Sequence, residues 1–296
     1  MSMPHQRGFD RRALRRAFNR ASDSYDAVAA LQDAVRQELL ERLEFFALSP
    51  RHVLDLGAGT GAGSAALLRR YRGASVVAAD VAEHMLGVAR RRGRLWRRPH
   101  AVAASANALP FADASFDLVF CNLMLQWCDE PQRVFAEIQR VLRPGGLLQL
   151  SSFGPLTLCE LRAAWDAADD TPHVSELPDL QALAGAMSAA GLAEPVMDRE
   201  LHMRHYADVD ALAGELRQLG AVNAARARRR SMTGARRAAR MRAAYETQRV
   251  AQGLPASYEI YYASAFAGRA PRSPDTGGAD EIVVPLARIH RRSHRR

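Results

Sequence analysis

Residues 53–64 read VLDLGAGTGAGS, an apolar run that breaks into alternating glycines. Such a run predicts a buried β-strand, and the glycines predict a tight turn at which the backbone approaches a ligand closely. Helix-forming residues follow over 62–71 and complete a strand–turn–helix unit. This unit is typical of α/β folds that bind nucleotides and related cofactors.

Two cofactor classes are open for this turn. Gly57-x-Gly59-x-x-Ala62 fits the dinucleotide pattern of NAD-dependent dehydrogenases. Asp55-x-Gly57-x-Gly59-x-Gly61 fits the tighter spacing of S-adenosylmethionine sites. The turn alone does not separate the two.

Strands and helices alternate on both sides of the turn. The predicted strands are HVLDLG (52–57), SVVAAD (75–80), HAVAAS (100–105), FDLVFCN (116–122) and LLQLSSF (147–153), with helices over 62–71, 82–91 and 131–142. This rhythm predicts an α/β fold with a doubly wound parallel sheet covered on both faces.

The flanking segments are mostly helical. Residues 10–47 predict one or two helices before the sheet, because apolar residues recur there at helical spacing. After residue 155 we expect helices over 156–169 and 179–191, a strand over 195–206, helix over 208–251 with a break near Gly234, and a last strand over 256–268. The helices at 10–47 and 208–251 have no place in the minimal fold, so we expect them to form a lid over the substrate pocket.

Composition excludes several protein classes. The chain has 296 residues, 48% of them hydrophobic, and no apolar run approaches the roughly 18 residues that a membrane span needs. The first residues lack the apolar core of a signal peptide, so we expect a cytoplasmic protein. Cys121, Cys128 and Cys159 have no metal-ligand spacing, and we expect reduced thiols and no metal.

The net charge of +9 points to an acidic partner. All 41 basic residues are arginines, which suggests the coding bias of a GC-rich genome and weakens the case for nucleic acid. Clusters occur at 90–98, at 226–230 and in the C-terminal tail. An acidic protein is as good a candidate as RNA.

Two aspartates bear on the choice of cofactor. Asp80 ends the second predicted strand, where a carboxylate can accept hydrogen bonds from both ribose hydroxyls of either cofactor. Asp55, two residues before the first glycine, would bring negative charge close to a pyrophosphate. S-adenosylmethionine has no phosphate, so Asp55 favours it.

The later part of the sequence resembles class I S-adenosylmethionine-dependent methyltransferases, which have a Rossmann-like fold. ALPFADASFDLVFCN (108–122) and RVLRPGGLLQL (140–150) match the fourth and fifth strands of that superfamily. The resemblance implies S-adenosylmethionine as cofactor, S-adenosylhomocysteine as product and no metal. The implied cofactor residues are Asp55, Gly57, Gly59, Gly61, Asp80, Val81, Met85, Ser105, Ala106 and Asn122. Ser105 stands where many members have an acid that binds the adenine amino group, so Ser105, Asn107 or a backbone carbonyl would replace it.

Four segments follow from this assignment. Residues 1–48 form an N-terminal helical segment, and residues 49–155 form the S-adenosylmethionine-binding core. Residues 156–268 supply the rest of the sheet and the helical substrate lid. Residues 269–296 form a basic tail that we expect to be disordered, apart from a short EIVVP segment.

Missing motifs exclude several methyl acceptors. CNLMLQW replaces the N/D-P-P-Y/F turn of enzymes that methylate amino groups of nucleic acids, and no cysteine follows a proline as in cytosine-C5 enzymes. No His–Asp or His–Glu pair marks a general base for a hydroxyl group.

Six segments resemble the BioC family, the malonyl-[acyl-carrier protein] O-methyltransferases of biotin synthesis. They are FNRASDSYDAVAALQ (18–32), SFDLVFCNLMLQWC (115–128), SSFGPLTLCELRAAW (151–165), DDTPHVSELPDL (169–180), LRQLGAVNA (216–224) and GLPASYEIYYASA (253–265). The resemblance runs from about Phe9 to Ala267. It implies methylation of the free carboxylate of a malonyl thioester on acyl carrier protein, an acidic partner that the arginine surface would suit. A carboxylate is ionised at neutral pH and needs no base.

Seven residues are candidates for the substrate side: Tyr25, Gln126, Trp127, Phe153, Gly154, Thr157 and His173. Tyr25, Gln126 and Trp127 are expected to position the reactants. Arg162 or Arg217 could pair with the substrate carboxylate, although a solvated helix face is the simpler expectation for each arginine.

Other functions stay open at this stage. Methyltransferase-like complex I assembly factors share several of the later segments and would act on a protein side chain, although YDAVAALQ (25–32) and LQW (125–127) fit the BioC family better. A basic RNA-associated protein that keeps the fold is a second alternative, and a dehydrogenase is a remote third.

Overall fold

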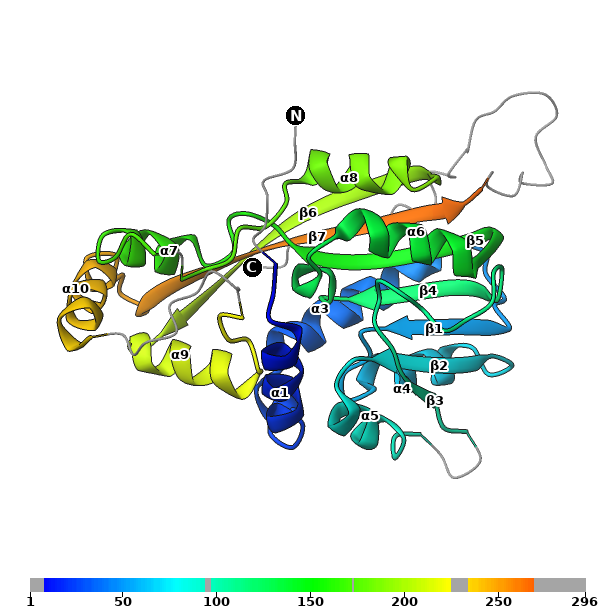
Figure 1. The fold of residues 1–296 in the computed structure, drawn as a ribbon, viewed down its shortest axis with the longest axis horizontal. Coiled ribbons are helices and arrows are strands. Elements are labelled where there is room, and N and C mark those ends of the chain that lie inside the picture. Colours follow the sequence, from blue (N-terminus) through cyan, green and yellow to red (C-terminus); the bar gives the residue numbers. More distant parts are fainter. Residues whose placement is uncertain (1–7, 94–96, 172, 225–233, 269–296) are drawn as a thin grey trace, which may run out of the picture.

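A computed structural model of the chain describes residues 8–93, 97–171, 173–224 and 234–268. Its centre is a seven-stranded sheet with the order β3-β2-β1-β4-β5-β7-β6 (Figure 1). The strands are β1 (His52–Leu56), β2 (Ser75–Asp80), β3 (His100–Ala103), β4 (Phe116–Asn122), β5 (Leu142–Phe153), β6 (Leu192–Tyr206) and β7 (Leu254–Ala267). Strands β1 to β5 pair in parallel, as the alternating pattern predicts, whereas β7 is antiparallel to both of its neighbours.

The sheet order reverses direction at β1. Strand β1 pairs with β2 on one side and with β4 on the other, so the chain leaves it toward both halves of the sheet. Val53 and Leu54 of β1 are fully buried because both faces of the sheet are covered. Doubly wound sheets bind ligands at the carboxyl ends of the strands beside such a reversal, which is where the glycine turn lies.

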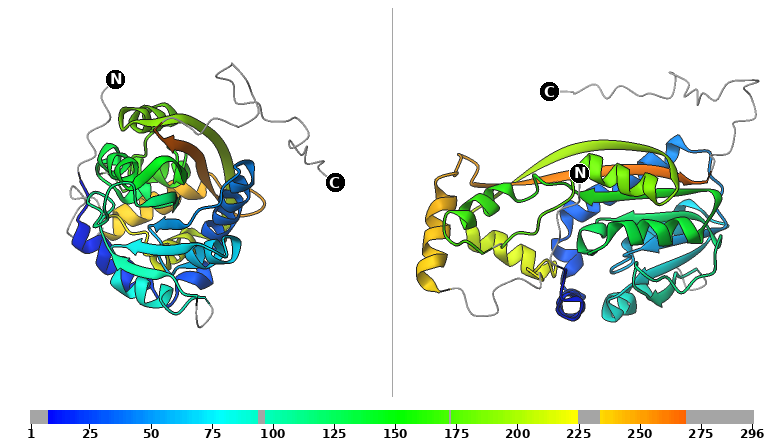
Figure 2. Two further views of the ribbon diagram at one scale, coloured as in Figure 1. Left: turned by 90° about the vertical axis from the view of Figure 1, so that its right-hand side faces the viewer. Right: turned by 45° about the horizontal axis from the view of Figure 1, so that its top comes forward.

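Helices cover both faces of the sheet (Figure 2). The helices within the α/β unit are α4 (Ala62–Arg70), α5 (Glu83–Ala89), α6 (Pro131–Val141) and α8 (Leu180–Ala189). Buried apolar residues of α6 and α8 form one core with β4 and β5, and those of α3 and α4 form another with the opposite face. These amphipathic helices therefore hold the sheet between two apolar layers.

The N-terminal segment is helical but more broken than predicted. It forms α1 (Arg11–Ala21), α2 (Tyr25–Val28), α3 (Ala30–Glu41) and a short 3₁₀ turn over Arg42–Phe45. Ala29, with ψ of 30°, interrupts the apolar pattern between α2 and α3. The break turns the short helix α2 toward the glycine turn, which a continuous helix would not reach.

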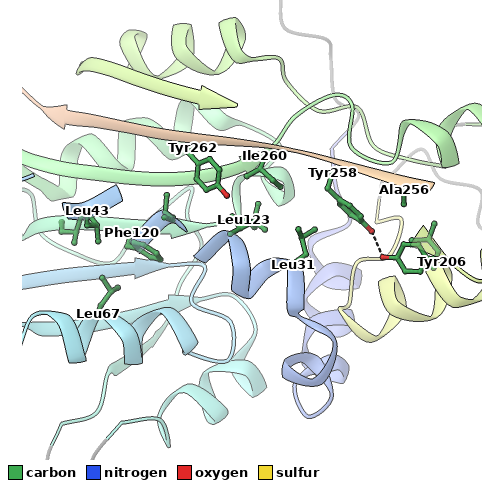
Figure 3. Packing of buried hydrophobic residues seen from close by; sticks show 14 of the residues in the cluster. Leu31, Leu43, Leu67, Phe120, Leu123, Tyr206, Ala256, Tyr258, Ile260 and Tyr262 are labelled. Carbon is green, nitrogen blue, oxygen red and sulfur yellow. Dashed lines mark hydrogen bonds between the residues drawn. The ribbon is translucent and has the colours of Figure 1, made fainter. Parts of the chain in front are cut away.

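Strands β6 and β7 run the length of the molecule and extend past β5 (Figure 1). Helices α7 (Cys159–Asp166), α9 (Val209–Gln218) and α10 (Ala235–Glu246) pack around this extension. Figure 3 shows part of the core there, where Leu31 and Leu123 lie near Tyr258. The extension thus supplies a second wall beyond the carboxyl ends of the parallel strands.

Several sequence predictions fall outside the described residues. These are the basic cluster at 226–230, part of the cluster at 90–98, the EIVVP segment and the tail over 269–296. Within the described ranges, no helix combines the length and apolar character that crossing a membrane requires.

Candidate active site

The glycine turn joins β1 to α4 with left-handed backbone at three positions. Gly57, Gly59 and Gly61 have φ of 77°, 52° and 81°, a region that side chains with a Cβ rarely adopt. A Cβ at Gly57 would lie 2.3 Å from the Met124 side chain, and one at Gly61 would lie 2.6 Å from Ala89. A Cβ at Gly59 would meet no atom within 4 Å. The turn therefore packs tightly at both ends and presents open space at its middle glycine.

The side chain of Asp55, a residue of β1, lies at the first turn of helix α4. Its side chain is 2% exposed, and its Oδ2 accepts a hydrogen bond of 2.5 Å from Ser64 Oγ. Burial, with a smaller contribution from the charge of Asp80, raises the pKa of Asp55 to about 6 against the lowering effect of the hydrogen bonds from Ser64. The positive end of the helix is therefore already matched by a carboxylate of the protein.

Asp80 binds the glycine turn to the end of β2. Its Oδ2 accepts from the Gly59 backbone N–H at 2.9 Å, and its Oδ1 accepts from the Ala82 N–H at 2.8 Å. Burial raises the pKa of Asp80, although these hydrogen bonds act in the other direction. Val81 beside it is 38% exposed, an apolar surface next to a carboxylate with lone pairs to spare.

This arrangement fits a cofactor with a positive charge better than one with phosphates. A dinucleotide places its pyrophosphate at the helix N-terminus, but Asp55 takes that position here and would repel it. The negative charges of Asp55 and Asp80 repel each other. A nearby cation, such as an ammonium or sulfonium group, would stabilise both ionised carboxylates. The open space at Gly59 leaves room for such a ligand beside Asp80.

The other predicted cofactor residues lie around the same edge with mixed exposure. Met85 is buried in a small cluster with Ala21 and Ala82. Ala106 is also buried, and Ser105 begins a tight turn in which its Oγ accepts from the Asn107 N–H at 3.4 Å. Ser105 is partly exposed, and its carbonyl accepts from the Ala108 N–H at 3.0 Å, so the turn after β3 uses both its main-chain and its side-chain oxygen.

Asn122 ties the N-terminal helices to the sheet. Its Nδ2 donates to the Gln32 carbonyl at 3.2 Å, and its Oδ1 accepts from Ser151 Oγ at 2.8 Å. Both ends of the amide are therefore engaged within the protein. Asn122 places α3 against the carboxyl end of β4, close to where the cofactor edge begins.

A pocket of about 170 Å³ adjoins this edge. Its walls come from the N-terminal helices, the segment after β4, the segment after β5, the segment before α8, the end of α9 and strand β7. Six predicted substrate residues line it: Tyr25, Gln126, Trp127, Phe153, Thr157 and His173. The segments predicted to form a lid, 10–47 and 208–251, both contribute to its walls.

Tyr25 connects the pocket with the cofactor edge. It lines the pocket and also packs against Ala82 and Met85, just past the end of β2. Burial, and then the negative charge of Asp80, raise the pKa of the Tyr25 phenol well above its usual range. The phenol therefore stays protonated, and within the described residues its hydroxyl has no hydrogen-bond partner.

Three buried polar atoms on the pocket walls lack hydrogen bonds among the described residues: Gln32 Oε1, Gln126 Oε1 and His173 Nε2. The His173 ring stacks on Trp165 with centroids 3.7 Å apart, and its Nε2 lies 3.5 Å from Asp169 Oδ2. Buried polar groups without partners are uncommon and call for an explanation such as a bound ligand. The pocket is thus prepared for a polar molecule.

The segment after β5 is held by strand β7. Thr157 Oγ1 donates to the Glu259 carbonyl at 3.2 Å and accepts from the Glu259 N–H at 3.1 Å, so its hydroxyl is used within the fold. Gly154 does not line the pocket, and a Cβ there would lie 2.5 Å from Glu259 Oε2. Arg162 donates to the carbonyls of Pro155 and Thr157 and supports the same turn.

The pocket contains residues that sequence reasoning missed. Glu215 of α9 accepts from Arg204 at 2.5 Å and from the Tyr206 hydroxyl at 3.1 Å. Tyr206 is in turn bonded to Tyr258 at 3.2 Å (Figure 3). Gln32 was missed as well. Nothing in the local pattern marks a glutamine or glutamate on an amphipathic helix, because such residues usually face solvent.

No arginine lines the pocket within the described ranges. Arg217 is exposed and donates to the Ala213 carbonyl of its own helix at 2.9 Å. Likewise, no group of three or more His, Cys, Asp or Glu side chains there has the arrangement of a metal site.

A network links helix α2 to the glycine turn. Asp26 accepts from Thr60 Oγ1 at 2.7 Å and forms an ion pair with Arg92. Arg92 also donates from Nε to the Thr60 carbonyl at 2.6 Å. The residue after Tyr25 is therefore fastened to the turn that faces the cofactor space, and we call this network the α2 latch (Asp26, Thr60 and Arg92).

Comparison with known proteins gives a consistent result. A family model described as a methyltransferase domain matches residues 54–150. The chain is 46% identical over 261 residues to the malonyl-[acyl-carrier protein] O-methyltransferase of Xylella fastidiosa strain M23, covering 88% of each chain. It is 43% identical over 287 residues to the protein of the same name from Halorhodospira halophila, covering 96% of each. Among solved structures, the YcgJ protein of Bacillus subtilis shares the fold with a TM-score of 0.57 at 17% identity, covering 79% of this chain and 99% of that one.

Proposed function

Because this chain belongs to the family of malonyl-[acyl-carrier protein] O-methyltransferases, we propose that it methylates the free carboxylate of a malonyl thioester carried by acyl carrier protein. The product would be the malonyl methyl ester that starts pimeloyl synthesis for biotin. The observation that carries the proposal is the pocket beside Asp80, with mostly apolar walls and a few unpaired polar groups, and with Tyr25 reaching both. The cytoplasmic location and the four-segment division of the chain remain part of this proposal.

The enzyme is an S-adenosylmethionine-dependent methyltransferase with a class I Rossmann-like fold. When bound, S-adenosylmethionine supplies a methyl group on a positively charged sulfur. In this proposal Asp80 would hold the ribose hydroxyls, and Asp55 would add negative charge close to the amino end of α4. The glycine turn leaves space for the cofactor at Gly59.

This reaction needs no general base, so the His173–Asp169 pair at the pocket wall is not required to remove a proton. A malonyl carboxylate is ionised at neutral pH and is itself the nucleophile. The task of the protein is to hold one carboxylate oxygen in line with the methyl group and to exclude water. The apolar walls of the pocket, including Trp127 and Phe153, suit the second task.

Neutral hydrogen-bond donors suit the first task, which is to hold the carboxylate in line with the methyl group. The Tyr25 hydroxyl is protonated and unpaired within the described residues, and the Gln32 amide can turn its NH₂ group toward the pocket. A carboxylate held by neutral donors keeps more of its nucleophilicity than one neutralised by a guanidinium group. The absence of arginine from the described pocket walls supports this role for Tyr25 and Gln32.

The lid would close the pocket around the thioester. Helices α1 to α3 and the end of α9 supply its outer walls, and the α2 latch joins this region to the glycine turn. Closure would bring the acceptor next to the cofactor and shield both from water. His173, stacked on Trp165, would border the acceptor on the side away from Tyr25.

Methyl transfer to malonyl acyl carrier protein tests the proposal. Label from S-adenosylmethionine should appear on the malonyl form and not on the acetyl form, which lacks a free carboxylate. The labelled product should release methanol on mild alkaline hydrolysis, as an ester does. Absence of label on the malonyl form, with cofactor binding intact, would overturn the proposal and direct the search to a protein side chain or RNA as acceptor.

A further inference from the structure

The arginines of this protein differ in their surroundings. Many of them are paired with acids inside the fold: Arg36 with Asp33, Arg42 with Asp198, Arg70 with Glu44, Arg92 with Asp26, Arg140 with Glu137, Arg143 with Asp117, Arg204 with Glu215, Arg242 with Asp210 and Arg249 with Glu246. The charges of these nine arginines are thus compensated locally. Uncompensated arginines are the informative ones.

Helix α1 concentrates such arginines on one face. Its sequence, RRALRRAFNRA, has five arginines and no acid, and all five are exposed. Arg11 lies 3.7 Å from Asp129. Arg12, Arg15, Arg16 and Arg20 have no ion pair and no hydrogen bond within the described residues. We call these four residues the α1 arginine face.

The arrangement disfavours the helix by itself. Arg12, Arg16 and Arg20 follow one another at a spacing of four, so their side chains are neighbours along one row. Like charges in that relation repel and lower helix stability. A partner that brings negative charge would relieve the repulsion, whereas solvent alone only screens it.

The opposite face of α1 forms a wall of the active site. Phe18 lines the pocket and packs edge-on against Trp127, with ring centroids 5.3 Å apart. Asn19 Oδ1 accepts from the His84 N–H of α5 at 3.0 Å, which holds the end of α1 beside the cofactor edge. The α1 arginine face therefore lies one helix diameter, about 10 Å, from the pocket.

We propose that the α1 arginine face docks an acidic protein surface and so delivers a tethered substrate to the pocket behind it. This inference rests on the proposed function, in which the acidic partner is the acyl carrier protein. Charge complementarity of this kind speeds encounter and fixes orientation. Arg69 and Arg72 are also exposed and free of ion pairs among the described residues, but Arg69 lies in the last turn of α4 and Arg72 just after it, at the opposite edge of the sheet.

Charge reversal of two arginines tests the docking face. The variant Arg12→Glu/Arg16→Glu is compared with Arg69→Glu/Arg72→Glu, which changes the net charge equally. Binding of malonyl acyl carrier protein is followed by fluorescence anisotropy at low and at physiological salt. Methyl transfer is measured in parallel with the malonyl carrier protein and with malonyl-pantetheine, which lacks the protein.

We expect the α1 variant to bind the carrier protein at least about tenfold more weakly, with a smaller salt dependence, as for other charged interfaces. Its KM for the carrier protein should rise in step, while turnover of malonyl-pantetheine and the melting temperature stay unchanged. The Arg69→Glu/Arg72→Glu variant should behave as the unaltered enzyme.

Three results would overturn the docking face. They are equal carrier binding by the α1 variant and the unaltered enzyme, equal losses in both double variants, and a loss confined to the binding of a single-stranded RNA probe. If the unaltered enzyme bound the carrier protein normally but transferred no methyl group to any malonyl substrate, the proposed function would be rejected and the docking face would stand.

Discussion

The cofactor edge and the substrate pocket are built in different ways. The cofactor edge consists of short stretches around Asp55 and Asp80, whose carboxylates are held by the Ser64 hydroxyl and by nearby backbone N–H groups. The pocket is assembled from segments between Phe18 and Tyr258, and two of its buried polar atoms, Gln32 Oε1 and Gln126 Oε1, have no partner in the described chain. One region is prearranged by its own backbone, whereas the other is completed by what it binds. Substitutions should therefore affect the two regions differently.

The largest expected effect is at Asp80. Asp80→Asn removes the charge that two backbone N–H groups and the ribose would share, and each hydrogen bond to a charged group contributes about 1.5–3 kcal/mol. We expect the KM for S-adenosylmethionine to rise about 100-fold. Initial rates at varied cofactor concentration measure it.

Asp117→Asn is the matched control. Asp117 accepts from the N–H groups of Arg51 and His52 at the opposite edge of the sheet. This variant should lose stability and keep its KM. Equal KM values for the Asp80→Asn variant and the unaltered enzyme would remove Asp80 from the cofactor site.

Substitution of Asp55 should weaken cofactor binding less than substitution of Asp80, and it should raise the stability of the protein rather than lower it. Its pKa is raised in the folded protein to about 6, so the folded state holds the proton more tightly than the unfolded chain. This group therefore stabilises the cofactor-free protein below the unfolded pKa, and its contribution is lost as pH rises through about 6. Asp55→Asn should raise stability at pH 8 by about 1–3 kcal/mol and weaken cofactor binding about tenfold.

Calorimetry and thermal unfolding across pH 5 to 8 check both parts. In the unaltered enzyme, cofactor affinity should fall as pH drops through about 6, because a protonated Asp55 no longer favours a cation. The variant should lose that dependence. A variant that is less stable at pH 8 would show that the Ser64 hydrogen bond outweighs the buried charge.

Tyr25→Phe sharpens the comparison, because Tyr25 belongs to both regions. The ring would keep its packing on Met85 while the hydroxyl is lost. We expect the KM for the malonyl substrate to rise about fivefold to tenfold, the value of one hydrogen bond, with the cofactor KM nearly unchanged.

Tyr245→Phe controls for the loss of a buried hydroxyl, since Tyr245 donates to the Pro255 carbonyl away from the pocket. It should lower the melting temperature and leave both KM values alone. If only the cofactor KM rose in Tyr25→Phe, the Tyr25 hydroxyl would be assigned to the cofactor site instead of the substrate pocket.

The smallest effect is expected at the α2 latch. Asp26→Asn weakens a partly exposed ion pair with Arg92, and such pairs contribute about 0.2–1 kcal/mol. We expect kcat to fall about twofold to fivefold, because Tyr25 is held less firmly. Asp210→Asn breaks an exposed pair with Arg242 and should change neither kcat nor KM. Equal behaviour of the two variants would make the latch a surface contact only.

The contrast between the cofactor edge and the substrate pocket also explains which features could be predicted from the sequence. The positions of the parallel strands along the chain and the glycine turn were predictable, because apolar periodicity and glycine spacing are local signals. Six of the predicted substrate residues do line one pocket. The antiparallel pairing of β7 and the breaks within residues 10–47 were not predicted, since they depend on tertiary contacts rather than local pattern.

Individual residues show where prediction stops. Thr157 carries a plausible polar group, but its hydroxyl is used by the Glu259 backbone, which no local pattern reveals. Gln32 and Glu215 look like solvent-facing helix residues and yet line the pocket. Which helix face is covered depends on how distant segments pack, and a single sequence does not encode that in any short stretch.

The aromatic contacts of the pocket have an optical consequence. The chain has three tryptophans. Trp127 lies between Phe9 and Phe18 and lines the pocket, and Trp165 is stacked on His173, which lines it too, while Trp96 lies outside the described residues. Their emission depends on the polarity and contacts of those rings. The protein thus carries its own fluorescent reporters, and a stopped-flow trace after mixing with substrate would time the entry of the acyl group without any attached dye.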